Sequence, residues 1–303
     1  MSTRRDNEAF ALRISKLTNR PLTAHKGSFG HALLIGGTTG MTGAIAIAGM
    51  ACLRSGAGLV TLAIPEPSLN VVASFNPCYM TRPLQCDAEG RLNKQAMAQL
   101  ALPIQKATCV AIGPGLGRSE ESDCLVETLY RELTIPMVVD ADALNALSQS
   151  QTWKDCLSRP SDSTLANDIK RILTPHPGEW ERLTGVASAD RKSQIAAANE
   201  VARKMNAVIL LKGHRSWITD GHNTCENSTG NPSMASGGNG DCLTGIIAAL
   251  LCQGLPCLEA AKLGAALHGV AGDLAHRELR SPSSLPTDLI QNLPAAFRTI
   301  LES

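Results

Sequence analysis

The stretch Ser236-Gly237-Gly238-Asn239-Gly240-Asp241-Cys242-Leu243-Thr244-Gly245 leads directly into an apolar segment, 246–251. Leucine and isoleucine recur over 243–251 at the spacing of one helical face, so this part of the chain is predicted to be a helix. The glycines before it permit a tight turn, and the first N–H groups of a helix, together with its dipole, attract an anion. The stretch therefore predicts a glycine loop that holds a phosphate at the start of a helix.

Two interpretations of Asp241 fit this position. Aspartate is among the residues preferred as a helix N-cap, and capping is the commoner role for an aspartate at such a place. An aspartate beside a phosphate could also serve as the base that accepts a proton during phosphoryl transfer. The local sequence alone leaves both interpretations open and favours the cap.

The composition limits the class of protein. The chain has 303 residues, of which 44% are hydrophobic and 18% charged, so it can form one large globular domain or two small ones. The net charge is +1 and aromatic residues make up 3%, which argues against a nucleic-acid partner. Because the sequence contains neither a signal-peptide pattern nor an uninterrupted apolar run of roughly 18 residues, we expect no membrane partner and a cytoplasmic location.

The ten cysteines give little sign of a metal or redox site. Five of them lie in apolar, periodic segments and are expected to be small core residues: Cys52, Cys109, Cys124, Cys242 and Cys252. The sequence contains no C-x-x-C pair. A zinc or redox protein is therefore the least favoured interpretation.

Strand-like and helix-like segments alternate along the chain, which is typical of an α/β fold with a parallel sheet. A turn with the sequence Asp220-Gly221-His222-Asn223 predicts an antiparallel hairpin near the end of the sheet. The expected strands are 32–35, 59–64, 79–83, 109–112, 137–139, 172–174, 208–211, 216–219 and 224–227. The expected helices include one around Phe10 to Leu17, one over 43–55 that is buried on most sides, one over 67–75 and one that begins near Glu120.

Glycine-rich or polar clusters follow the carboxyl ends of five predicted strands. Each cluster alone would be an ordinary connection. In open parallel α/β sheets, however, the carboxyl ends of the strands form the edge at which ligands bind. Five clusters on one edge therefore predict a ligand site there. The clusters are Gly36-Gly37, Gly113-Pro114-Gly115-Leu116-Gly117, Asp140-Ala141-Asp142-Ala143-Leu144-Asn145, Pro175-His176-Pro177-Gly178-Glu179 and Lys212-Gly213.

These clusters, together with Lys26-Gly27-Ser28-Phe29-Gly30-His31, Gly43-Ala44 and Thr229-Gly230-Asn231, occur in an order that resembles the NAD(P)H-hydrate dehydratases of the ribokinase-like superfamily. The resemblance spans about residues 26–301. It implies a three-layer α/β/α sandwich with a mostly parallel central sheet. Many relatives carry an epimerase domain before the dehydratase. The 25 residues before Lys26 are too few for one, so we expect an N-terminal helix and entry segment over 1–25 and a single dehydratase domain over 26–303.

The resemblance also implies a repair reaction. The hydrated S epimer of NADH or NADPH would be phosphorylated on its ring hydroxyl by ADP or ATP, with Mg²⁺, and phosphate would then be eliminated. Asp241 would accept the hydroxyl proton, and the N–H groups of Gly238, Asn239 and Gly240 would surround the phosphoryl group. Lys212, Gly213, His214, Arg215, Ser216 and Gly240 would bind the nucleotide, and Ala44, Gly115, Gly117, His176 and Asp241 the hydrated dinucleotide. Glu179 would hold Mg²⁺ through water, and relatives suggest a homotetramer.

Two alternatives to this function remain. A vitamin kinase of the same superfamily, acting on a hydroxymethylpyrimidine, thiazole or pyridoxal alcohol, would use the same Gly-x-Gly-Asp unit. It would not need residues 113–117 together with His176. A non-catalytic dinucleotide sensor would be indicated by loss of Asp241 or of the anion-binding glycines, and both are present.

Overall fold

The computed structural model describes residues 17, 19–158 and 170–302. Their strands form one nine-stranded sheet in the order β3-β2-β1-β4-β5-β6-β7-β8-β9. The first seven strands are parallel, and β8 and β9 continue the sheet as antiparallel edge strands. The strands are β1 (His31–Ile35), β2 (Leu59–Pro65), β3 (Met80–Leu84), β4 (Cys109–Ile112), β5 (Met137–Val139), β6 (Arg171–Leu173), β7 (Ala207–Leu211), β8 (Ser216–Thr219) and β9 (Thr224–Asn227).

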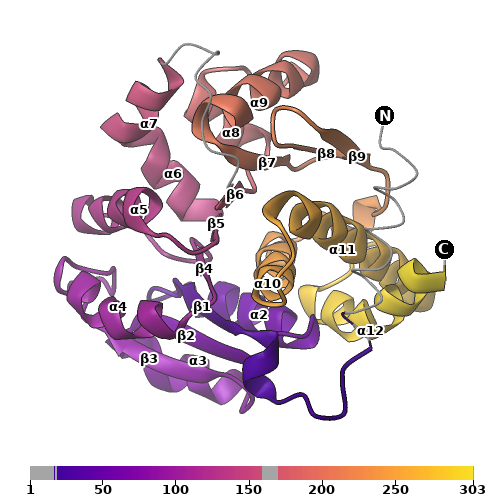
Figure 1. The fold of residues 1–303 in the computed structure, drawn as a ribbon, viewed down its shortest axis with the longest axis horizontal. Coiled ribbons are helices and arrows are strands. Elements are labelled where there is room, and N and C mark those ends of the chain that lie inside the picture. Colours follow the sequence, from indigo (N-terminus) through magenta and orange to yellow (C-terminus); the bar gives the residue numbers. More distant parts are fainter. Residues whose placement is uncertain (1–16, 18, 159–169, 303) are drawn as a thin grey trace.

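Helices cover both faces of the sheet, which gives three layers (Figure 1). One layer contains α2 (Thr42–Arg54), α3 (Leu69–Phe75), α10 (Asn239–Cys252), α11 (Cys257–Leu279) and α12 (Pro286–Glu302). The other contains α4 (Gln95–Lys106), α5 (Glu120–Glu132), α6 (Ala141–Gln149), α7 (Gln151–Leu157), α8 (Pro177–Thr184) and α9 (Arg191–Met205). The described residues also form three short 3-10 helices, η1 (Lys26–Phe29), η2 (Glu66–Ser68) and η3 (Pro232–Met234).

The two layers have separate hydrophobic cores, because side chains alternate along each strand. In β1, Ala32 and Leu34 pack into the core beneath α2 and α10, whereas Leu33 and Ile35 pack into the opposite core. All four side chains are almost completely buried. Strands covered on both faces are expected to be continuously apolar, and the sequence of β1 follows that rule.

Helix α10 is the most deeply buried of the described helices near the candidate site. It packs against α2, and a Cβ atom on Gly245 would lie 2.1 Å from the carbonyl oxygen of Ala48. Glycine is therefore required at this helix contact. The close packing fixes the position of the start of α10 relative to the edge of the sheet.

The predicted α/β sandwich is confirmed, and the predicted strands agree with the observed ones to within about two residues. Most of the helix expected around Phe10 to Leu17 lies outside the described residues. The expectation for Cys124 was wrong, because its side chain is exposed, whereas Cys52, Cys109, Cys242 and Cys252 are buried as predicted. The buried face of α5 is formed by other residues, Ser122, Leu125, Val126, Leu129 and Tyr130.

Candidate active site

The position of Asp241 excludes one of its two interpretations. Helix α10 begins at Asn239, and its N-cap is Gly238, whose φ of 92° lies in the left-handed region that favours glycine. Asp241 is thus the third residue of the helix, and the cap interpretation was wrong. An acidic side chain in a first turn still interacts favourably with the helix dipole.

The backbone around the start of α10 is held by hydrogen bonds from both sides. The Asn239 side chain donates to the Met234 carbonyl oxygen and to Ser236 Oγ, each at 2.9 Å. On the other side, His268 Nε2 from α11 lies 2.8 Å from the carbonyl oxygen of Asn239. Burial lowers the pKa of His268 to about 4, so this imidazole is neutral and donates its proton to that carbonyl. His268 supports the predicted anion site, although no motif in the sequence had indicated it.

A buried ion pair lies beside this helix start. Asp140 follows β5, and its carboxylate accepts from Lys212 Nζ at 2.8 Å and from Thr244 Oγ1 at 2.7 Å. These three side chains belong to different elements, since Lys212 follows β7 and Thr244 lies in α10. Burial alone would raise the pKa of Asp140, but the Lys212 ammonium and these hydrogen bonds hold that pKa below its usual value. Asp140 is therefore an ionised, fully buried link between β5, β7 and α10.

Two further carboxyl groups face the same ammonium. The nearest oxygen of Glu179 lies 3.9 Å from Lys212 Nζ. Burial, together with the negative charge of Asp140, raises the pKa of Asp241 to about 7. Burial likewise raises the pKa of Glu179 to about 7, although Lys212 opposes that rise. Three carboxyl groups thus share one partly buried cation, an arrangement that often marks a functional site.

His176 is the N-cap of α8. Its Nδ1 accepts from the N–H groups of Gly178 at 3.0 Å and Glu179 at 3.2 Å, and Glu179 Oε2 accepts from the His176 N–H at 2.7 Å. Burial and the charge of Lys212 lower the pKa of His176. Lys212 and Asp140 also shift the pKa of Asp241, so His176 and Asp241 face the same charged centre rather than opposite edges of the sheet.

Three of the predicted dinucleotide residues lie near the point where the strand order reverses, between β1 and β4, which is the usual place for a ligand in such sheets. The Gly37 N–H donates to the Pro114 carbonyl oxygen at 3.0 Å, which joins the two loops. A Cβ on Gly115 would lie 3.2 Å from the Cβ of Ala44. Gly117 donates its N–H to Asp142 Oδ2 at 3.0 Å. The structure therefore brings Ala44, Gly115 and Gly117 together, next to the Asp142 carboxylate, for which no role was predicted.

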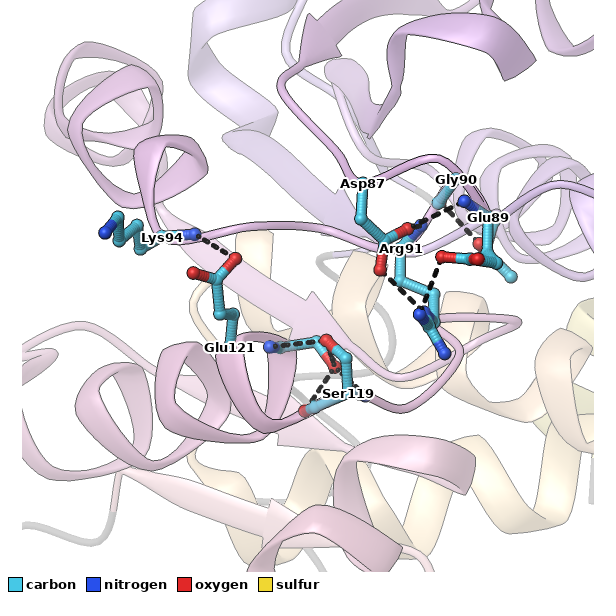
Figure 2. Close-up of polar contacts among 9 residues, drawn as sticks. Asp87, Glu89, Gly90, Arg91, Lys94, Ser119 and Glu121 are labelled. Carbon is cyan, nitrogen blue, oxygen red and sulfur yellow. Dashed lines mark hydrogen bonds and ion pairs between the residues drawn. The ribbon is translucent and has the colours of Figure 1, made fainter.

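A loop between β3 and α4 borders this region. Asp87 accepts from the Arg91 N–H at 2.8 Å and from Arg91 Nε at 2.7 Å, while Arg91 also pairs with Glu89 at 2.8 Å (Figure 2). The Thr38 hydroxyl donates to the Gly90 carbonyl oxygen, so the loop is attached to the one that follows β1. In the same view, the Lys94 N–H donates to Glu121 on α5 at 3.3 Å. Polar loops of this kind carry no recognisable sequence pattern, and this wall of the site was not predicted.

The predicted nucleotide-binding residues form the connection from β7 to β8, apart from Gly240. Gly213, His214 and Arg215 are exposed, and Arg215 pairs with Glu226 at 2.9 Å. Arg191 at the start of α9 donates to three carbonyl oxygens of this connection, those of Leu211, Lys212 and Arg215, at 3.1–3.2 Å. The Lys212 side chain departs from the others, because it points toward Asp140 rather than along the exposed connection. Arg191, which the sequence reasoning missed, fixes the shape of this segment.

The carboxylates do not form a metal cage of their own. Within the described ranges, no group of three or more His, Cys, Asp or Glu side chains is arranged to hold a metal ion. Mg²⁺ usually keeps several waters and binds through one or two carboxylates and substrate phosphates. Glu179, whose carboxyl group is buried near Lys212, fits such an outer position but not a protein-only site.

The sheet order, the three layers and the glycine loop at α10 define a ribokinase-like protein. A solved ribokinase-like superfamily protein from Enterococcus faecalis matches with a TM-score of 0.79 and 28% identity, covering 96% of this chain and 94% of its own. The sequence profile of the NAD(P)H-hydrate dehydratase family matches residues 32–295. The chain therefore belongs to the NAD(P)H-hydrate dehydratase family.

Individual relatives agree with this assignment. An ADP/ATP-dependent NAD(P)H-hydrate dehydratase from Bacillus subtilis, co-crystallised with ATP and Mg²⁺, matches with a TM-score of 0.75 and 28% identity, with 96% of each chain covered. A bifunctional NAD(P)H-hydrate repair enzyme of Moorella thermoacetica is 41% identical over 292 residues, which are 95% of this chain and 53% of the relative. The chain thus spans about half the length of the bifunctional relatives it matches.

Proposed function

We propose that this chain restores hydrated NADH or NADPH, using ADP or ATP as the phosphoryl donor. The observation that carries the proposal is the position of Asp241, a partly buried carboxyl group in the first turn of α10 with a pKa of about 7. A base works best when its pKa lies near the working pH. Asp241 also lies beside the N–H groups that would hold a phosphoryl group, and those groups have no partner within the helix.

The reaction has two parts. The hydroxyl oxygen on the hydrated ring attacks the terminal phosphorus of the nucleotide, the hydroxyl proton passes to Asp241, and the shortened nucleotide leaves. The lone pair of the ring nitrogen then expels phosphate, and loss of a proton from the neighbouring ring carbon restores the dihydropyridine. The N–H groups of Gly238, Asn239 and Gly240 stabilise the charge of the phosphoryl group during its transfer.

Binding of the two substrates divides between two regions of the sheet edge. The nucleotide lies along Lys212, Gly213, His214, Arg215 and Ser216 and ends at Gly240. The hydrated dinucleotide lies against Ala44, Gly115, Gly117 and His176, with its ring at Asp241. Mg²⁺ would supply further neutralisation of the phosphates, with Glu179 holding its water. These assignments follow from family resemblance, and the proximity of the loops supports them.

We further propose a homotetramer in the cytoplasm. Large apolar side chains that remain exposed, among them Val71, Phe75 and Met80, support burial between subunits. Among the described residues, no helix combines the length and apolar composition needed to cross a membrane. Light scattering at micromolar concentration tests the assembly, and a monomer would contradict it.

The activity is tested by incubating the purified protein with hydrated NADPH and either ADP or ATP. The expected result is recovery of the absorbance of the reduced ring, dependent on nucleotide and accompanied by release of one phosphate per ring restored. Phosphorylation of a vitamin alcohol without repair of the hydrate would favour the vitamin kinase. Binding of both ligands without turnover would favour a dinucleotide sensor.

A further inference from the structure

We propose that Asp140 is a positioning residue for phosphoryl transfer, because it fixes the Lys212 ammonium beside Gly240 as a permanent cation facing the transferred group. This inference rests on the proposed function and assigns a task to a residue outside the catalytic set named above. It also gives Lys212 a different place from its neighbours 213–216, which lie along the rest of the nucleotide.

The ordinary role of an aspartate at a helix start does not explain Asp140. Asp140 is the N-cap of α6, yet its side chain caps none of the N–H groups of that helix. Both carboxylate oxygens are directed elsewhere, one to Lys212 Nζ at 2.8 Å and the other to Thr244 Oγ1 at 2.7 Å. The carboxylate therefore joins two elements of the site instead of stabilising its own helix.

The backbone around Asp140 is constrained in ways that support this role. The next residue, Ala141, has a φ of 49°, a left-handed conformation that is unfavourable for alanine and is often found at functional sites. On the other side, a Cβ atom on Gly113 would lie 1.8 Å from the Asp140 carbonyl oxygen. Glycine at 113 and the left-handed residue at 141 thus constrain the backbone of Asp140.

The Lys212 ammonium lies where a phosphoryl group would arrive. A Cβ atom on Gly240 would be 3.5 Å from Lys212 Nζ, so the ammonium is adjacent to the first turn of α10. The Lys212 side chain is 19% exposed, so it is only partly buried. A lysine side chain is flexible and bears a compact charge, so it needs a fixed partner to stay in one place. Asp140 supplies that partner, and Thr244 holds Asp140 in turn.

Asp140→Asn tests the proposal, because the amide keeps the shape of the side chain but loses the charge that holds Lys212. We expect kcat for hydrated NADPH to fall about 10²-fold, with KM changed less than about threefold, since misplacement of a catalytic group has effects of this size. Lys212→Met should cause a similar fall, and the double variant should be no slower than Lys212→Met alone. If the two substitutions lower kcat multiplicatively in the double variant, the proposal is overturned. A change in KM alone for Asp140→Asn would also overturn it.

Calorimetry gives a second measurement that is independent of turnover. ADP carries the phosphoryl group that would face Lys212, and AMP does not, so the wild-type protein should bind ADP more tightly. Asp140→Asn should remove most of this preference while AMP binding stays the same. If the wild type binds both nucleotides but repairs no hydrate, the proposed function fails, and loss of the ADP preference in Asp140→Asn still supports the positioning role. An unchanged ADP preference would overturn it.

Two further variants separate positioning from folding. Thr244→Val removes one hydrogen bond to Asp140 and should lower kcat several-fold. Thr244→Ser keeps the hydroxyl and should have a kcat close to that of the wild type. Asp220→Asn changes an aspartate in the turn between β8 and β9, remote from this ion pair, and should leave kcat unchanged. A Thr244→Val enzyme with wild-type kcat and an intact ADP preference would contradict the proposed link.

Discussion

The backbone N–H of Thr38 lies 2.7 Å from the carbonyl oxygen of Gly115, and this hydrogen bond ties the loop after β1 to the loop after β4. The two residues are far apart in the sequence but meet where the strand order reverses. Because Gly115 has a φ of 57°, and a Cβ there would be 2.5 Å from the Met41 carbonyl oxygen, only glycine fits this contact.

Gly115→Ala should therefore disturb the dinucleotide site. We expect a loss of about 1–3 kcal/mol in the free energy of unfolding and a raised KM for hydrated NADPH. Gly40→Ala is the matched control, because Gly40 also has a positive φ, 85°, but its Cβ would meet no atom within 4 Å. Thermal unfolding and steady-state kinetics compare the two variants. Equal increases in KM would show that the contact with Met41 does not shape the site.

Arg191→Ala should weaken nucleotide binding. The Arg191 guanidinium holds three carbonyl oxygens between Leu211 and Arg215, and without it the nucleotide would have to order this segment on binding. We expect the Kd for ADP, measured by calorimetry, to rise about tenfold. Lys192→Ala removes the adjacent exposed cation and should leave the Kd unchanged. An unchanged Kd in Arg191→Ala would place the nucleotide elsewhere.

The pH dependence of the reaction should report the Asp241 carboxyl group. Burial and the charge of Asp140 raise its pKa to about 7, and the base must be ionised to accept a proton. We expect kcat/KM to be level above pH 7 and to fall about tenfold for each pH unit below it. A rate that stays level down to pH 5.5 would indicate a base with an ordinary carboxyl pKa.

The same raised pKa has a consequence for stability. Between pH 4 and 7 the folded chain retains a proton on Asp241 that the unfolded chain has lost, so this residue makes the free energy of unfolding fall as the pH rises. Asp241→Asn removes that effect. Its melting temperature should exceed that of the wild type at pH 8, and the difference should shrink toward pH 4. A variant that is less stable than the wild type at pH 8 would show that the ionised carboxylate is stabilising.

The sequence predicted the parts of the site that depend on local patterns. Continuous apolar runs revealed the strands, and the polar clusters after them revealed the sheet edge along which Gly115, His176 and Lys212 lie. Contacts between distant residues were not predictable. Asp140 and Thr244 are 104 positions apart, and His268 reaches Asn239 from another helix. The N-cap was also missed, because the left-handed turn at Gly238 starts α10 two residues before Asp241.

Turnover of Asp241→Asn tests the central claim most directly. Because Gly238 is the N-cap and Asn keeps the size of the side chain, the variant should fold and should bind ADP within about threefold of the wild type. If Asp241 accepts the hydroxyl proton, repair of hydrated NADPH should fall about 10²–10⁴-fold. An Asp241→Asn enzyme that repairs hydrated NADPH at a rate close to the wild type would contradict the account.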